Sequence, residues 1–184
     1  KENLEYRQTD FHRLLYGSLG ITFSVSDEEA ERIYWDHSLH FELETGISET
    51  LEYLQRSGVR LAVISNTVYS AYTLRHELEK KGILDYFEFV VSSADYGVRK
   101  PDPLLFKVAE GRLGLSASEC GYVGNLTEVD VEGARRAGWA SMWYTGGSIG
   151  SESYASQLDR LPENCFVVDD WREFNRLLVS SPTK

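Results

Sequence analysis

Hydrophobic residues in the first third of the chain recur with the period of an α-helix. A first helix is predicted by four residues at this spacing: Phe11, Leu14, Leu15 and Leu19. Ser26 and Glu29 have the spacing of a capping box, which predicts the start of a second helix with Ala30, Ile33 and Tyr34 on one face. Gly46 and Gly58 bracket a third predicted helix, whose inward face is made of Ile47, Leu51 and Leu54.

From residue 61 the pattern changes to short hydrophobic runs that alternate with amphipathic stretches. The runs predict strands at 61–64, 87–91, 121–123, 140–144 and 166–168. The stretches between and after them predict helices at 71–81, 103–113, 127–137 and 174–178. This alternation is typical of a doubly wound α/β fold with a parallel sheet covered on both faces. Residues 145–164 show no clear period and are predicted to form a loop.

Composition narrows the class of protein. With 184 residues and 42% hydrophobic content, the chain can bury one substantial core. The net charge of -10 argues against nucleic acid as a partner, because such binding depends on clustered Lys and Arg. No hydrophobic stretch approaches the ~20 residues of a membrane span, and no signal peptide is visible. The two cysteines, Cys120 and Cys165, lie in apolar runs and read as buried thiols, so we expect a cytoplasmic protein.

Ligands of open parallel sheets bind beyond the carboxyl ends of the strands, so the residues after each run are the candidate site. Ser65 and Asn66 follow the first run, where a hydroxyl and backbone N–H groups ahead of a helix can bind an anion. Lys100 follows the second run and is held by Pro101 and Pro103, which directs an ammonium at this edge. When each motif is considered alone, the residues after the first run are also explained as a helix N-cap, and Lys100 is also explained as an exposed surface lysine.

The third run is followed by oxygen-bearing side chains, of which Asn125 and Asp130 are the candidate metal ligands. Oxygen ligands at a strand end suit Mg²⁺, which keeps several waters and takes few protein carboxylates. By itself this segment is equally well explained as the polar start of a helix. The order and placement of all three motifs together are what make the signal specific.

At this point the chain resembles the haloacid dehalogenase superfamily. The resemblance rests on three motifs in order: Ile64-Ser65-Asn66, then Lys100-Pro101-Asp102-Pro103 with Phe106, then Val123-Gly124-Asn125 through Asp130 with Gly133-Ala134 and Gly138. The subgroup that it resembles most is phosphatase-like and carries a helical cap. The resemblance implies residues 1–45 as a partial N-terminal cap and residues 46–184 as an α/β core.

The resemblance also implies a role for each residue. Ser65 is expected to bind the transferred phosphoryl group and Asn66 to position it. Lys100 is expected to neutralise the substrate and the nucleophile. Asn125 and Asp130 are expected on the side of the Mg²⁺ ion.

Two features depart from the family. Its first motif is a strand that ends in two aspartates one residue apart, the first of which is the nucleophile, and this chain has no Asp-x-Asp pair. Because that strand is central in the family's sheet, its loss would expose unpaired backbone, and we expect it upstream of Lys1. The second departure is Asn125, where phosphatases of the family have a charged metal ligand.

Three functions therefore stay open. The first is hydrolysis of a small phosphomonoester through an aspartyl-phosphate. The second is metal-independent dehalogenation of a 2-haloacid, which the neutral Asn125 keeps in consideration. The third is a non-catalytic, degenerate member that binds a ligand or a protein. The five aromatic residues of the cap are expected to form its core rather than a substrate pocket: Tyr16, Phe23, Tyr34, Trp35 and Phe41. Substrate identity and oligomeric state are not predicted.

Overall fold

The computed structural model describes residues 3–146, 158 and 161–180. The chain divides into two compact units, and each is considered separately. The first unit comprises Lys1–Glu42 and Leu61–Arg99, and the second comprises Leu43–Arg60 and Lys100–Lys184. This division runs through the core predicted from the sequence, so the predicted boundary between cap and core at residue 45 stays a prediction.

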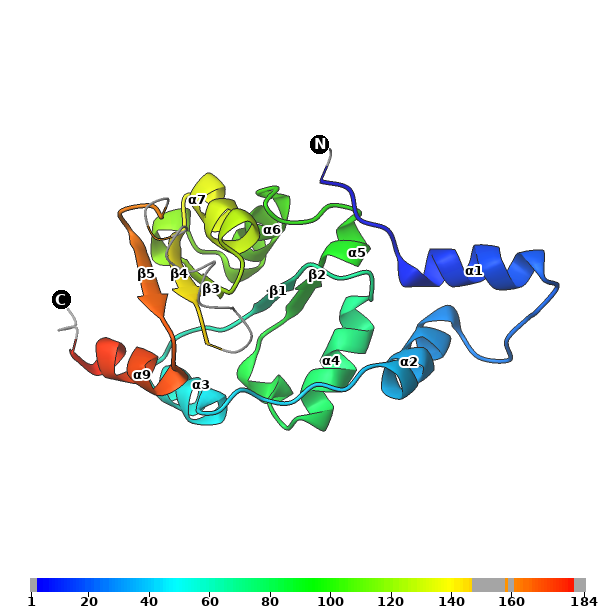
Figure 1. The fold of residues 1–184 in the computed structure, drawn as a ribbon, viewed down its shortest axis with the longest axis horizontal. Helices are drawn as coiled ribbons and strands as arrows, with labels where there is room; N and C mark the ends of the chain where they lie inside the picture. Colours follow the sequence, from blue (N-terminus) through cyan, green and yellow to red (C-terminus); the bar gives the residue numbers. More distant parts are fainter. Residues whose placement is uncertain (1–2, 147–157, 159–160, 181–184) are drawn as a thin grey trace. The chain divides into compact units, whose positions relative to one another are not determined.

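The first unit is built on a parallel pair of strands, β1 (Val63–Ser65) and β2 (Val90–Ser92), joined by helix α4 (Ala71–Lys80). Parallel strands need such a crossover. Helices α1 (Gln8–Ser18) and α2 (Asp27–Ser38) precede this pair in the sequence (Figure 1). Two short elements were not predicted: a 3-10 turn (Leu84–Tyr86) and the one-turn helix α5 (Ser93–Tyr96).

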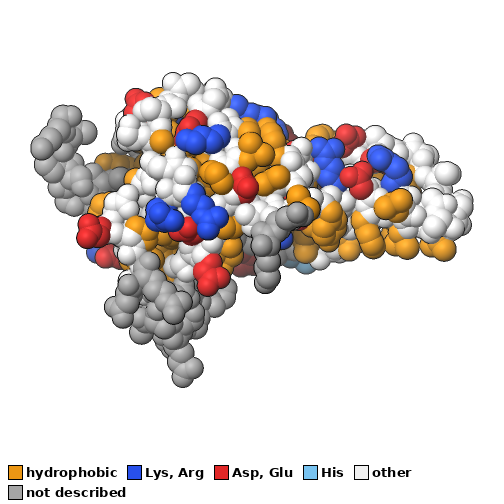
Figure 2. All heavy atoms as spheres, turned by 90° about the horizontal axis from the view of Figure 1, so that it is seen from above, with side chains coloured by type: hydrophobic (Ala, Val, Ile, Leu, Met, Phe, Trp, Pro, Cys, Tyr) orange, Lys and Arg blue, Asp and Glu red, His pale blue; other side chains and the backbone are white. Residues whose placement is uncertain are grey.

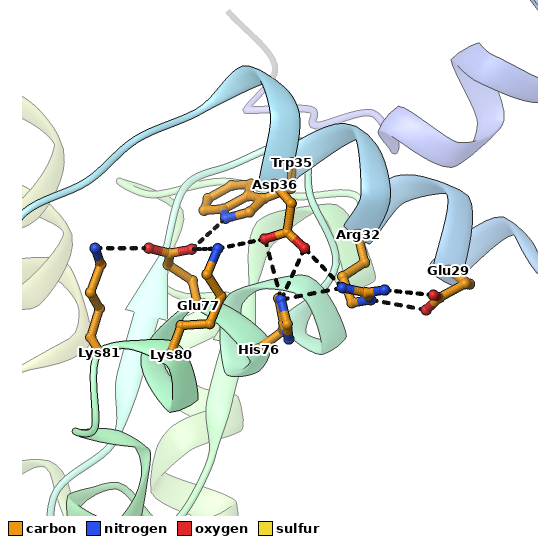
Figure 3. A network of polar contacts seen from close by, with 8 residues as sticks. All are labelled: Glu29, Arg32, Trp35, Asp36, His76, Glu77, Lys80 and Lys81. Atoms are coloured by element: carbon orange, nitrogen blue, oxygen red, sulfur yellow. Dashed lines mark hydrogen bonds and ion pairs between the residues drawn. The ribbon is translucent and has the colours of Figure 1, made fainter.

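Helix α2 packs against α4 through a polar network (Figure 3). Asp36 accepts from Lys80 at 2.5 Å and contacts His76 at 3.2 Å. The buried Trp35 donates its indole N–H to the Glu77 carboxylate at 2.9 Å. This packing buries Trp35, which stacks on Phe41 with ring centres 5.2 Å apart.

The start of α2 differs in one respect from the predicted capping box. The Ser26 hydroxyl does accept from the Glu29 backbone N–H at 3.1 Å. The reciprocal bond is replaced, because the Glu29 carboxylate takes two hydrogen bonds from Arg32, at 2.6 and 2.9 Å. An arginine one turn along the helix competes successfully for the carboxylate.

The predicted aromatic core of the cap is only partly present. Trp35 is buried, whereas Phe23, Tyr34 and Phe41 are about half exposed. Figure 2 shows hydrophobic side chains along one edge of this helical segment, at the right. Seven large hydrophobic residues of α1 and of the loop that follows it are exposed: Phe11, Leu14, Leu15, Leu19, Ile21, Phe23 and Val25. The face formed by Ala30, Ile33 and Tyr34 lines an open cavity of about 300 Å³ with His12 and Tyr16.

The second unit is a three-stranded parallel sheet in the order β3-β4-β5, with helices on both faces (Figure 1). The strands are β3 (Gly121–Gly124), β4 (Ala140–Tyr144) and β5 (Cys165–Val168). One face carries α6 (Leu104–Leu113) and α7 (Glu132–Ala137), and the other carries α3 (Ile47–Arg56) and α9 (Trp171–Ser180). A 3-10 turn (Ala117–Glu119) precedes β3. Cys120 is buried as predicted, whereas Cys165 is half-buried, and both are free.

The α/β architecture with parallel strands agrees with the prediction, but the strands form two sheets rather than one. Among the described residues β1 pairs only with β2, and β3 pairs only with β4. The first two strands are also shorter than predicted, because only 63–65 and 90–92 lie in register. Most of the loop predicted at 145–164 lies outside the described residues. None of the described helices has the length and hydrophobicity that a membrane crossing requires.

Candidate active site

The five predicted site residues fall in both units. Ser65 and Asn66 belong to the first unit, whereas Lys100, Asn125 and Asp130 belong to the second. Within the second unit the structure brings Lys100 and Asp130 into direct contact. Ser65 ends β1, and Asn125 and Asp130 follow β3, as the sequence predicts. Lys100 lies further along the chain, beyond the short helix α5 that follows β2.

Ser65 is the last residue of β1 and lies opposite Ser92 of β2. It is half-buried, and its hydroxyl makes no hydrogen bond with another residue of the described part of the chain. Strand pairing fixes the Ser65 backbone, and the segment after it leads into the N-terminus of α4. A hydroxyl at this position is therefore available to an anionic ligand.

Lys100 is nearly completely buried, with 6% of its surface exposed. Its ammonium donates to Asp130 Oδ1 at 2.7 Å and to the hydroxyl of Tyr122, and it lies 4.7 Å from the centre of the Tyr122 ring. Burial lowers the pKa of Lys100 below its ordinary value, and the Asp130 carboxylate opposes this shift. Burial, together with the nearby Asp130 charge, raises the pKa of Tyr122 well above its ordinary value. Tyr122 therefore stays a neutral phenol beside the charged pair.

The turn that follows β3 carries Asp130 and packs its side chain closely against the end of the strand. The first turn after β3 is a π-helix (Thr127–Val131) rather than the α-helix predicted at 127–137. The second carboxylate oxygen of Asp130 accepts from the Leu126 N–H at 3.0 Å. A Cβ on Gly124 would lie 2.4 Å from the Asp130 Cβ, so a residue without a side chain is required at 124. π-Helical turns occur frequently at functional sites.

Asn125 is exposed at the end of β3, and its carbonyl accepts from the buried Trp143 indole N–H at 3.1 Å. The structure offers limited support for a metal centre here. Both Asp130 oxygens already take hydrogen bonds, and Asn125 brings no charge. In the described part of the chain, no three His, Cys, Asp or Glu residues are grouped so as to hold a metal ion. The residues described do not by themselves fit Mg²⁺, and the metal roles of Asn125 and Asp130 stay predictions.

A cavity of about 320 Å³ lies at the carboxyl ends of β3 and β4. Its wall includes Asn125 and Glu44, together with the rings of Tyr144 and Trp171, which stack 4.7 Å apart. No role was predicted from the sequence for four residues: Tyr144, Trp171, Glu44 and Tyr122. Tyr122 directly precedes the third motif and lies two residues before Gly124, so alternation along the strand places both on one face.

Similarity to a known protein family shows the superfamily to which this chain belongs. A family model described as haloacid dehalogenase-like hydrolase matches residues 22–144. The chain belongs to this family. The match includes all five predicted site residues, and the parallel strands with crossover helices are the expected fold.

Relatives of this haloacid dehalogenase-like hydrolase include several phosphatases. The phosphoserine phosphatase of Thermus thermophilus is 36% identical over 48% of this chain and 35% of its own length. The glyceraldehyde 3-phosphate phosphatase of Methanothermobacter thermautotrophicus is 30% identical over 71% of this chain and 56% of its own length. The chain thus spans less than two thirds of the length of these relatives.

Solved structures share the fold. A phosphatase of the same superfamily from Thermococcus onnurineus has a TM-score of 0.67 and 22% identity, over 95% of this chain and 74% of its own. A 2-haloacid dehalogenase from Pseudomonas syringae has a TM-score of 0.68 and 24% identity, over 94% of this chain and 72% of its own. Both likenesses concern the fold alone.

Proposed function

We propose that this haloacid dehalogenase-like hydrolase is a phosphatase for a small phosphomonoester. The observation that carries the proposal is the Lys100 ammonium, which is 6% exposed and is held by Asp130 and by the Tyr122 hydroxyl. A desolvated cation in a fixed position stabilises the charge that develops during phosphoryl transfer. The similarity to several phosphatases supports the same assignment.

The proposed reaction runs in two steps. An aspartate oxygen attacks phosphorus, the bond from phosphorus to the ester oxygen breaks, and an aspartyl-phosphate forms. The leaving oxygen takes its proton from the second aspartate of the missing Asp-x-Asp pair and departs as the alcohol, and that aspartate recovers a proton from the water of the next step. Water then attacks phosphorus, and inorganic phosphate leaves while the carboxylate is regenerated. Ser65 and Asn66 would bind the phosphoryl oxygens, and Lys100 would neutralise the anionic reactants.

The nucleophile is not among the 184 residues, because the chain contains no Asp-x-Asp pair. We place it on a further strand of the natural protein. In support of this, β1 and β3 each have a single strand partner among the described residues, which leaves one backbone edge of each open. An open strand edge presents unpaired backbone groups with which a further strand can pair. The Mg²⁺ requirement is likewise a proposal that needs a ligand beyond Asn125 and Asp130.

The proposal is tested by assaying the full-length natural protein against small phosphomonoesters, with and without Mg²⁺. Lys100→Met should lower kcat/KM by about 100- to 1,000-fold, the usual cost of losing one charge-stabilising group. The control is Lys107→Met, because Lys107 is 52% exposed and pairs with Glu110 at 2.9 Å. Thermal unfolding of each variant separates lost chemistry from lost folding. Absence of turnover on every phosphoester by the folded wild type would refute the proposal and favour a non-catalytic binding role.

A second candidate is a metal-independent 2-haloacid dehalogenase. It is favoured by Asn125, which is neutral and exposed where a charged metal ligand is expected. The same preparation should then release halide from a 2-haloacid at a rate that a chelator does not change. A strict Mg²⁺ requirement for turnover would exclude this candidate.

A further inference from the structure

The segment that follows Ser65 is held in place at every residue from 67 to 71. The Ser93 hydroxyl accepts from the Thr67 N–H at 2.8 Å. The Val68 carbonyl accepts from the Gln8 N–H at 2.8 Å, and the Tyr69 carbonyl accepts from the Ser92 hydroxyl. Such a dense set of bonds leaves this loop little freedom of its own.

The far end of the loop is held by Glu31 of α2. Glu31 is 1% exposed, and its Oε2 accepts from the Ser70 N–H at 3.0 Å and from the Ser70 hydroxyl. The same oxygen accepts from the Thr73 hydroxyl at 2.6 Å. Ser70 is the N-cap of α4, so the carboxylate lies where the helix dipole favours negative charge.

No cation pairs with Glu31 in the ion pairs of the described chain, which makes this buried charge unusual. Its other oxygen, Oε1, is buried and has no hydrogen-bond partner among the described residues. A buried carboxylate held only by neutral donors is costly to maintain for packing alone. The donors that it gathers all come from the end of the loop or the first turn of α4.

A second buried carboxylate holds the near end of the loop. The side chain of Glu5 is 2% exposed. The single proton of the Ser93 hydroxyl lies between Glu5 Oε2 and the Thr67 carbonyl, each 3.0 Å from the Ser93 oxygen. Thus two carboxylates from the helical N-terminal segment, one on each side of the loop, orient the hydroxyls that hold it.

We propose that Glu31 is a positioning residue for the anion-binding Ser65-Asn66 segment, with Glu5 in a supporting role. The helical segment 3–38 then sets the backbone that presents Ser65 and Asn66. The proposal rests on the proposed function for its phosphate-binding and catalytic readouts, whereas the hydrogen-exchange readout is independent of that function. Displacement of a binding group by about 1 Å can cost about 100-fold in rate.

The experiment compares Glu31→Gln with Asp36→Asn in the full-length natural protein. Both residues lie on α2 and both bond to α4, but the polar contacts of Asp36 are with Arg32, His76 and Lys80 and not with the described loop residues (Figure 3). Amide hydrogen exchange is measured over residues 66–71, with the dissociation constant for inorganic phosphate and the kcat and KM for a phosphoester. Thr73→Val is the milder second variant in case Glu31→Gln does not fold.

Glu31→Gln should speed exchange at 66–71 by about 10-fold or more over Asp36→Asn, because the loop loses its charged acceptor. It should also weaken phosphate binding and lower kcat/KM by about 10- to 100-fold. Thr73→Val should change all three in the same direction but less. Equal exchange at 66–71 in Glu31→Gln and Asp36→Asn, or unchanged phosphate binding, would overturn the proposal. A wild type without turnover refutes the phosphatase instead, while the exchange comparison still decides the role of Glu31.

Discussion

Asp130 in the second unit and Glu31 in the first are both buried carboxylates, but their charges are balanced in different ways. Asp130 is 4% exposed and pairs with the Lys100 ammonium at 2.7 Å. Glu31 is 1% exposed and takes only backbone and hydroxyl donors. Asp130 is therefore balanced by an opposite charge, whereas Glu31 is stabilised by the dipoles of neutral hydrogen-bond donors.

The largest effect is expected for Asp130→Asn. This change leaves the Lys100 ammonium buried without its counter-charge, and breaking such a pair typically costs about 3–5 kcal/mol. The free energy of unfolding is measured by urea denaturation of the natural protein. Glu132→Gln is the control, because Glu132 lies nearby but is 29% exposed. A loss within about 1 kcal/mol of the control would contradict the importance of the pair.

Glu31→Gln should cost less, because its partners are neutral and no stranded charge remains. We expect a loss of about 1.5–3 kcal/mol, the range for hydrogen bonds to a charged group. The same denaturation experiment gives the value, with Asp36→Asn as the reference. If Glu31→Gln destabilises as much as Asp130→Asn, the distinction between the two carboxylates fails.

Gly124→Ala tests how closely Asp130 must approach the strand. The added Cβ would lie 2.4 Å from the Asp130 Cβ, so the carboxylate must shift away from Lys100, at a cost of about 1–3 kcal/mol. Gly121→Ala is the matched control on the same strand, because the nearest atom to its Cβ would be 3.9 Å away. Equal stability of the two variants would show that the contact is not needed.

The smallest effect is expected from the half-buried carboxylate of Glu132. Hydrogen bonds from Arg135, and secondarily from Arg136, lower the pKa of Glu132 from its ordinary value of 4.5 to about 2. The folded-state pKa is depressed, so the stabilisation is fully present above pH 4.5 and is lost as the pH falls toward 2. Solvent screening limits it to about 0–1 kcal/mol. Unfolding of wild type and Glu132→Gln across this pH range should therefore converge at low pH; a constant difference would contradict the assignment.

Local features of the fold could be predicted because they depend on neighbouring residues. The third predicted helix, bracketed by Gly46 and Gly58, is found as Ile47–Arg56, with Leu51 buried. The Ser26 cap and the strand-end position of Ser65 were also predicted correctly, whereas Lys100 lies beyond the unpredicted helix α5 rather than directly after β2. The π-helical turn at Thr127–Val131 was not, because an ordinary helix has the same sequence signal.

Glu31 was missed because it lies in the acidic run Asp27-Glu28-Glu29, Ala30, Glu31, which is typical of an exposed helix face. One signal in the sequence could have found it. Glu31 lies one helical turn before Trp35, which is predicted to be part of the cap core, so the two side chains lie on the same face of the helix. Lys100 was predicted as a directed cation, but its partners Asp130 and Tyr122 were not. Which side chains meet across 22 and 30 positions of sequence depends on how β3 and the turn after it pack.

The sequence by itself therefore determined the order of helices and strands, their caps, and which residues follow the strand ends, since these are set by residues a few positions apart. Only the tertiary structure decided how the buried charges are balanced. Glu31 meets Ser70 and Thr73 across 39 and 42 positions, and Asp130 meets Lys100 across 30. Burial of a charge is decided by the sum of such distant contacts, and no local period records that sum.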